Sequence, residues 1–85
     1  MIRYLPHAEE AITVRGIDRA WIESAIAIPD RTERDPRHPG RTRSYKAIAA
    51  FGGRVLRVVH WQEGADIMVL TVHFDRGATR GRQRR

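Results

Sequence analysis

Three polar side chains alternate with apolar ones in a segment of strand character near the C-terminal end of the chain. Thr71, His73 and Asp75 occupy every second position, and the residues between them are apolar. Because the side chains of a strand point alternately to its two faces, all three should lie on one face of a sheet. A hydroxyl, an imidazole and a carboxylate on one face can bind a phosphate or transfer a proton.

Cationic side chains lie on a second strand-like run, Arg54 to Trp61. Cleavage of RNA without a metal ion needs a base for the 2′-hydroxyl proton, cations for the phosphate and an acid for the leaving oxygen. We expect Arg57 to bind the phosphate, His73 to act as acid or base, and Thr71 to orient the phosphate. The alternative is that all three are ordinary solvent-facing residues of a half-exposed sheet.

Lys46, Arg54 and Trp61 are further candidates for binding a nucleic acid. The two cations should lie near Arg57, and the indole of Trp61, beside a loop, could stack on a base. The alternative is a solvent-facing role for the cations and a packing role for the indole.

His7 and Arg15 lie two turns apart on a predicted helix, on roughly the same side of it. One interpretation is that both reach over the edge of the sheet into the site. The other is that they interact only with the two ends of their own helix, where Arg15 suits the helix dipole.

The 85-residue chain has a net charge of +6, and much of the excess lies at its C-terminal end. We expect a single domain at residues 1–76 and a basic tail at residues 77–85 that is disordered until it binds. Arg80 and Arg82 of this tail could bind phosphates or an acidic partner protein.

No feature of the sequence indicates a metal site, a cofactor or a membrane segment. The chain has no cysteine, and its four histidines are not spaced as metal ligands usually are. It has no glycine-rich phosphate loop, and no apolar run approaches membrane-spanning length. We therefore expect a cytoplasmic protein without metal or cofactor. Its modest core could be enlarged by a homodimer.

Two helices are expected in the N-terminal part. The first runs from Pro6 to Arg15 and ends at Gly16, which can take the left-handed conformation of a helix terminus. The second begins after Asp18, a good N-cap residue, and ends before Pro29.

The C-terminal part predicts an antiparallel sheet. Three strands are expected at residues 43–51, 54–61 and 67–74, and Arg31 to Glu33 could add a short edge strand. Gly52-Gly53 would form a two-residue hairpin turn. The predicted fold is an α+β domain in which two N-terminal helices pack on a three- to four-stranded antiparallel sheet.

The expected turns set the pairing of the strands. They place Phe51 opposite Arg54 and Arg57 opposite Thr71. The face covered by the helices would then carry Tyr45, Ala47, Ala49, Leu56, Val58, Leu70, Val72 and Phe74. The polar face would carry Ser44, Lys46, Ile48, Arg57, Val59, Val69, Thr71 and His73. A slip of one residue would exchange the two faces.

Several blocks of sequence together form a recognisable pattern that extends from His7 to Arg76. The blocks are HAEE at 7–10, RGIDRAWIE at 15–23, DP at 35–36, TRSY at 42–45, GGRVLRVV at 52–59, IMVLT at 67–71 and FDR at 74–76. This pattern resembles the bacterial domain-of-unknown-function family 4258.

That family is in turn similar, more distantly, to the RelE and BrnT toxins, which have helices packed on one face of a small antiparallel sheet. Those toxins are ribonucleases that act without a metal. The resemblance therefore implies a toxin-like endoribonuclease with RNA as substrate and an acidic antitoxin protein as partner. RelE-type chains usually begin with a strand, for which residues 1–5 are short. The alternative function is a non-catalytic module that binds a nucleic acid or a protein through the same face.

Overall fold

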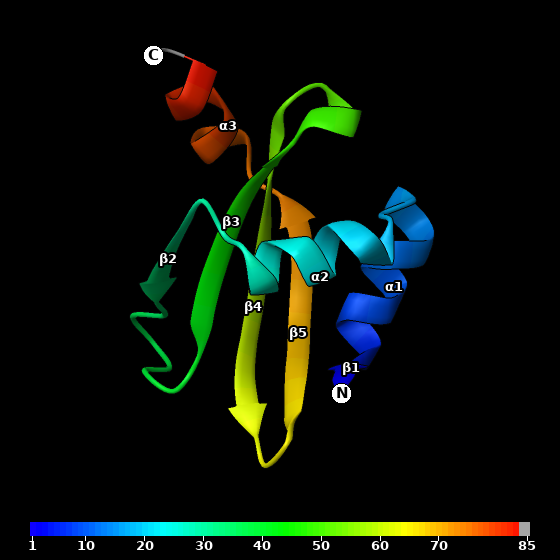
Figure 1. The fold of residues 1–85 in the computed structure, drawn as a ribbon, viewed down its shortest axis with the longest axis vertical. Helices are drawn as coiled ribbons and strands as arrows, with labels where there is room; N and C mark the ends of the chain where they lie inside the picture. The colour runs from blue at the N-terminus through cyan, green and yellow to red at the C-terminus, as the bar shows by residue number, and fades with distance from the viewer. Residues whose placement is uncertain (84–85) are drawn as a thin grey trace.

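A computed structural model describes the backbone of residues 1–83 and the side chains of residues 1–81. The fold is α+β, with three α-helices and a five-stranded mixed sheet in the order β1-β5-β4-β3-β2 (Figure 1). The elements are β1 (Ile2–Tyr4), α1 (Pro6–Arg15), α2 (Arg19–Ala27), β2 (Arg31–Arg34), β3 (Thr42–Ile48), a 3-10 helix (Ala49–Phe51), β4 (Arg54–Glu63), β5 (Asp66–Phe74) and α3 (Arg76–Gln83).

The two N-terminal helices follow their local sequence signals. Gly16 ends α1 with a φ of 62°, a left-handed conformation that glycine adopts without steric cost. Asp18 caps α2, and its Oδ1 accepts a hydrogen bond of 2.8 Å from the backbone N–H of Ala20. Ile17 and Ile22, which flank this cap, are both buried in the core. The predicted positions of both helices are confirmed.

The sheet differs from the prediction at its first edge. β1 pairs with β5 in parallel, with Ile2 opposite Ile67 and Tyr4 opposite Val69. The sheet is therefore mixed, and the expectation of a purely antiparallel sheet is wrong. A three-residue strand has too little alternation to be recognised from its own sequence. At the opposite edge, β2 pairs with β3, where the prediction had placed a short strand.

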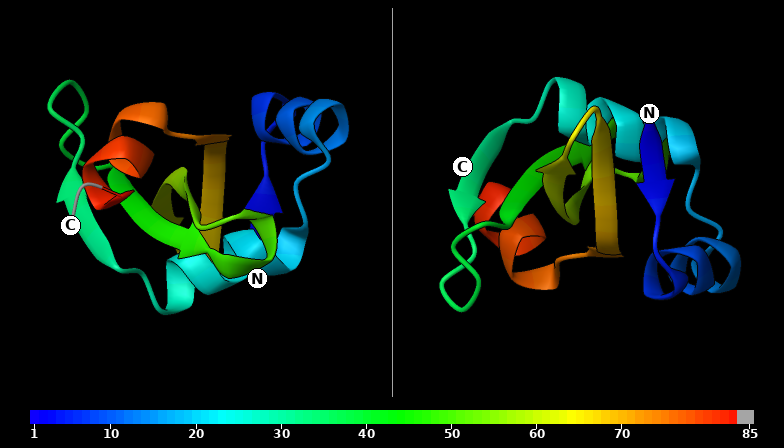
Figure 2. Two further views of the ribbon diagram at one scale, coloured as in Figure 1. Left: turned by 90° about the horizontal axis from the view of Figure 1, so that it is seen from above. Right: turned by 90° about the horizontal axis from the view of Figure 1, so that it is seen from below.

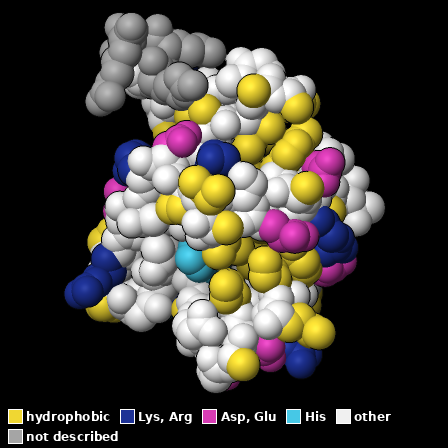
Figure 3. Space-filling model, in the orientation of Figure 1, with side chains coloured by type: hydrophobic (Ala, Val, Ile, Leu, Met, Phe, Trp, Pro, Cys, Tyr) yellow, Lys and Arg dark blue, Asp and Glu magenta, His cyan; other side chains and the backbone are white. Residues whose placement is uncertain are grey.

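The helices do not all cover one face. Both panels of Figure 2 show α2 on one side of the sheet and α1 and α3 on the other side. We call the side under α2 the packed face, and apolar side chains gather around α2 there (Figure 3). Its sheet residues include Ser44, Lys46, Ile48, Leu56, Val58, His60, Val69, Val72 and Phe74. We call the other side, which lies between α1 and α3, the open face.

The register of β3 differs from the expected one by three residues. Ala49–Phe51 forms a turn of 3-10 helix, so β3 ends earlier and Ile48, not Phe51, lies opposite Arg54. Gly52 and Gly53 do have positive φ, but they follow this helical turn and do not join two strands directly. An odd shift exchanges the two faces, so every predicted facing of a β3 side chain is reversed.

A bulge in β5 changes one further facing. Val59 pairs with Thr71 and His60 with Val69, so Leu70 is the extra residue between them. Val69 is consequently on the packed face, where it is fully buried, instead of on the polar face as predicted. After the bulge, at residues 71–74, β5 is shifted by two residues from the expected register, and an even shift keeps these side chains on the predicted faces.

A third helix follows the sheet. α3 occupies Arg76–Gln83, most of the segment predicted to be a disordered basic tail, so the helices are not confined to the N-terminal part. The hydroxyl of Thr79 accepts a hydrogen bond of 2.8 Å from the backbone N–H of Val55 and so connects α3 to β4. Residues 84 and 85, the end of the predicted tail, lie outside the described residues.

Candidate functional site

Arg57 and His73 lie directly opposite each other on neighbouring strands, in the middle of the open face. Arg57 of β4 pairs with His73 of β5 and, on its other side, with Tyr45 of β3. Directly opposed side chains in an antiparallel pair have Cβ atoms about 5 Å apart. The guanidinium and the imidazole are therefore held within reach of one small ligand.

A second arginine lies next to this pair. Arg43 precedes Tyr45 by two residues on β3, so both side chains are on the open face. The Nη1 atom of Arg43 is 3.2 Å from Oε1 of Glu33, and its Nη2 atom is 3.8 Å from Oδ1 of Asp35. These carboxylates fix the guanidinium at the border of the site.

Both arginines carry a buried donor that has no partner within the described residues. The Nε atoms of Arg43 and Arg57 are inaccessible to solvent and form no hydrogen bond there. A buried donor without an acceptor costs free energy, and such groups in a folded protein often mark functional sites. The rest of each guanidinium is partly exposed, and two such groups on one face suit an anionic ligand that accepts several hydrogen bonds, such as a phosphate.

Tyr45 joins the arginines to β2. Its hydroxyl donates a hydrogen bond of 2.6 Å to Oε1 of Glu33, and the guanidinium of Arg31 lies 3.8 Å from the centre of its ring. The hydrogen bond from Tyr45 is the main cause that lowers the pKa of Glu33. The Glu33 carboxylate therefore stays charged and holds Tyr45 and Arg43 in place.

The environment of His73 favours the neutral imidazole. Burial is the main cause that lowers its pKa from the ordinary value, and the positive charge of Arg57 lowers it further. Asp75 opposes this effect, whereas Arg15 and Arg43 contribute to it. At neutral pH the imidazole is therefore uncharged and able to accept a proton.

Two more predicted residues lie at this site. Arg15, the last residue of α1, is close enough to His73 for its charge to affect the pKa of the imidazole. Thr71 is two residues before His73 on β5 and is half-buried on the same face. Arg57, His73 and Thr71 thus share the open face, and Arg15 approaches it from the end of α1.

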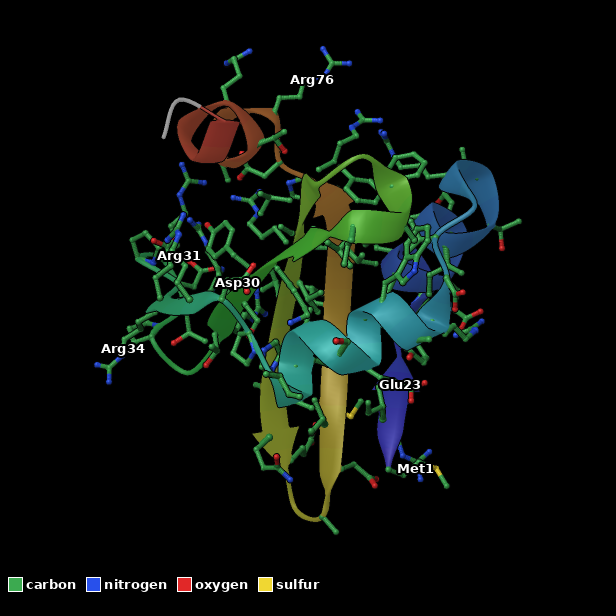
Figure 4. The ribbon with its side chains drawn as sticks, turned by 45° about the horizontal axis from the view of Figure 1, so that its top comes forward. Met1, Glu23, Asp30, Arg31, Arg34 and Arg76 are labelled. Carbon is green, nitrogen blue, oxygen red and sulfur yellow. The ribbon has the colours of Figure 1, made fainter. Side chains whose placement is uncertain are left out.

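Asp75 closes one end of the site. Its Oδ2 atom is 3.6 Å from Nη1 of Arg57, and its Oδ1 atom accepts a hydrogen bond of 2.9 Å from the backbone N–H of Ala78. That hydrogen bond is the main cause that lowers the pKa of Asp75, which is therefore ionised. A pocket of about 770 Å³ lies between α3 and the strands at this end, and Asp30 and Arg31 border it below α3 (Figure 4).

Trp61 closes the other end of the open face. It is four residues after Arg57 on β4, so both side chains have the same facing. The guanidinium of Arg41 lies 5.2 Å from the centre of its ring, and the indole N–H donates to Glu63 at 3.3 Å. A shallow pocket of about 380 Å³ separates Trp61 from the loop at residues 37–41.

Three predicted residues are not part of the site. Lys46 is on the packed face, because of the register of β3, and its Nζ atom donates a hydrogen bond of 2.7 Å to the carbonyl oxygen of Ile28. Arg54 lies over the rings of Phe51 and Phe74, 5.1 and 5.4 Å from their centres. His7 is exposed in the first turn of α1, at the opposite end of this helix from Arg15.

Two predicted residues of the basic tail belong to α3. Arg80 is exposed on this helix, which borders the open face. The side chain of Arg82 lies outside the described residues.

The sequence prediction missed Arg43, Tyr45 and Glu33. The assumed turn placed the two β3 residues on the packed face. Ala49 and Ala50 favour helix over strand, and they were the available signal that β3 ends at Ile48.

Within the described residues, no group of three or more His, Asp or Glu side chains is arranged to hold a metal ion. None of the described helices is both long and apolar enough to cross a membrane.

Comparison with known proteins gives one match. The model of a family described as a domain of unknown function, DUF4258, matches residues 4–73, which include both N-terminal helices, β2, β3, β4 and all of β5 except its last residue. Neither the curated proteins nor the solved structures contain a match to the chain. The matched region holds Arg15, Arg43, Arg57 and His73, and the chain belongs to the DUF4258 family.

Proposed function

We propose that this protein is an RNA-directed, toxin-like domain that binds RNA on its open face and cleaves it without a metal ion. The pairing of Arg57 with His73 supports this proposal most, because it combines a cation for the phosphate with an imidazole for proton transfer. The guanidinium groups of Arg43 and Arg57, each on a side chain about 25% exposed, give the phosphate several donors.

The proposed reaction is an internal transesterification of the RNA backbone. His73 accepts the proton of a 2′-hydroxyl, and the 2′-oxygen attacks the adjacent phosphorus while the bond to the 5′-oxygen breaks. A water molecule protonates the leaving 5′-oxygen, and the products are a 2′,3′-cyclic phosphate and a 5′-hydroxyl. Arg57, with Arg43 and Arg15 beside it, stabilises the extra negative charge of the phosphorane.

The net charge of +6 supports an acidic antitoxin as the protein partner, because an acidic segment would compete with RNA for the same arginines. The alternative function is a non-catalytic module that binds RNA on this face. The arginines and Trp61 favour it equally, whereas the position of His73 opposite Arg57 favours cleavage.

The test is incubation of the purified protein with a mixed RNA in EDTA, beside Arg57→Ala and His73→Ala variants. We expect His73→Ala to slow cleavage by about 10²–10⁴-fold and Arg57→Ala by about 10²–10³-fold. Arg34→Ala and His7→Ala are matched controls, because both residues are exposed and lie outside the site.

Cleavage that both site variants lose and both controls keep supports the proposal. Cleavage that survives both site changes contradicts it and indicates a contaminating nuclease or another site. RNA that is retarded in a salt-sensitive way but never cleaved favours the binding module.

A further inference from the structure

Trp61 and the loop at residues 37–41 form a second pocket on the open face, away from the Arg57–His73 pair. The pocket has a volume of about 380 Å³ and is bordered by Arg37, His38 and Arg41 besides the indole. Cationic side chains around an aromatic ring are typical of sites that bind nucleobases of a single strand.

The loop beside Trp61 is held by Asp35. The carboxylate of this buried residue accepts hydrogen bonds from the backbone N–H groups of Arg37 and His38, at 2.9 and 3.3 Å. The backbone N–H of Asp35 donates to the carbonyl oxygen of Arg41 at 2.9 Å. The pocket wall is therefore preorganised and does not need a ligand to form it.

Arg43 connects this pocket to the phosphate site, since its guanidinium faces Asp35 at 3.8 Å and lies on the same face as Arg57. Trp61 is four residues beyond Arg57 on one strand, which corresponds to about 13 Å. A single RNA strand covers this distance in a few nucleotides. The arginine side chains between the two positions can follow its phosphates.

We propose that the Trp61 pocket binds an unpaired nucleobase of the same RNA strand whose phosphate lies at Arg57 and His73, so that the substrate is single-stranded RNA. This inference rests on the proposed function. A base paired in a duplex cannot present its face to an indole, whereas an unpaired base can stack on it. The guanidinium of Arg41 lies 5.2 Å from the centre of the indole ring. It can stack on a neighbouring base or bind a neighbouring phosphate.

The test uses 2′-O-methyl oligonucleotides, which cannot be cleaved by attack of the 2′-hydroxyl. The chain has two tryptophans, and Trp21 packs against Phe51 and Phe74. A Trp21→Phe variant therefore leaves Trp61 as the single fluorescent indole. We expect its emission to fall on titration with a single strand, and to change little with a duplex of the same sequence at equal concentration.

Affinity measurements on Trp61 variants complete the test. Trp61→Ala should weaken binding of the single strand by about five- to 100-fold, and Trp61→Phe, which keeps a stacking ring, by much less. Unchanged emission with unchanged affinity of Trp61→Ala overturns the inference, and if Arg57→Ala still weakens binding, the proposed function remains. A preference of the parent protein for the duplex also overturns the inference. If the parent protein binds no RNA at all, both the inference and the proposed function are wrong.

Discussion

Asp75 and Arg57 form an ion pair across the end of the candidate site, with 3.6 Å between Oδ2 and Nη1. The pair is about one-quarter exposed on each side, at 23% and 25%. The distance is longer than that of a good charge-assisted hydrogen bond, so Arg57 is held by charge and keeps donors for another anion. An RNA phosphate at Arg57 therefore has to approach a carboxylate that is already there.

Replacement of Asp75 by Asn should strengthen RNA binding, because it removes a negative charge next to the phosphate position. The amide can still cap α3 at the N–H of Ala78. Because the pair is partly exposed, loss of the Asp75 charge should raise the affinity for RNA by at most about fivefold. Titration with a non-cleavable single strand measures this change. Asp66→Asn is the matched control, since Asp66 pairs with Arg3 at the other end of β5. Weaker binding of the Asp75 variant would contradict this account.

The pKa of His73 should respond in opposite directions to changes in its two charged neighbours. Arg57 lowers this pKa, so Arg57→Gln should raise it. Asp75 raises it, so Asp75→Asn should lower it further. NMR titration of the His73 imidazole protons in the parent protein and the two variants measures both shifts. Shifts of the same sign in both variants would show that the electrostatic description of the site is wrong.

Cleavage should depend on pH through the same group. Because the pKa of His73 lies below the ordinary value of 6.5, the neutral base is formed in the acidic range. The rate should rise as the pH increases through this pKa and then stay level through neutral pH. A rate that falls over the same range would indicate that His73 acts as the acid instead.

The hydrogen-bonded pair of buried Ser44 and half-buried His60 should contribute to stability on the packed face. Ser44 is 1% exposed, and its Oγ atom is 2.7 Å from Nε2 of His60. Ser44→Ala leaves the half-buried imidazole without this partner and should lower the free energy of unfolding by about 1 kcal/mol. Urea unfolding at pH 7.5 measures the difference. Thr32→Ala, at the exposed position opposite Ser44 on β2, should change it much less.

Acid should destabilise the fold through His60. Burial lowers the pKa of this imidazole from 6.5, so the folded protein binds the proton less readily than the unfolded chain. The resulting stability is complete above pH 6.5, the unfolded value, and is lost as the pH falls through the lower folded pKa. His60→Gln should reduce this loss between pH 7.5 and 5, as measured by urea unfolding. If the free energy of unfolding falls equally in the variant, the acid destabilisation comes from groups other than His60.

Local signals in the sequence were sufficient for the two N-terminal helices, but not for α3. Pro6, Gly16 and Asp18 each act on their own turn of backbone, so their effects do not depend on the rest of the fold. The strand pairings depend on contacts between distant residues. The parallel pairing of β1 and the bulge at Leu70 have no counterpart in the local sequence, so they could not be predicted from it.

The facing of a candidate residue could be predicted where it depends only on the alternation of side chains along a strand. Thr71 and His73 are two residues apart, and the shift of β5 against β4 is even, so both remain on the face of Arg57. The predicted facing of Lys46 was wrong because the register of β3 is shifted by an odd number of residues. The same shift places Arg43 and Tyr45 on the open face. The position of His7 could not be predicted, because helical spacing shows only which residues share a side of the helix. It does not show which end of the helix lies near the site.

The most direct test of the central claim is a map of RNA binding by ¹⁵N NMR, with a non-cleavable single strand added to the labelled protein. We predict that the largest shifts occur at Arg57, His73 and Arg43, and that residues of α2 on the packed face change little. The largest shifts on α2, or no shifts at RNA concentrations that saturate other RNA-binding domains, would contradict the assignment of the open face as an RNA-binding surface.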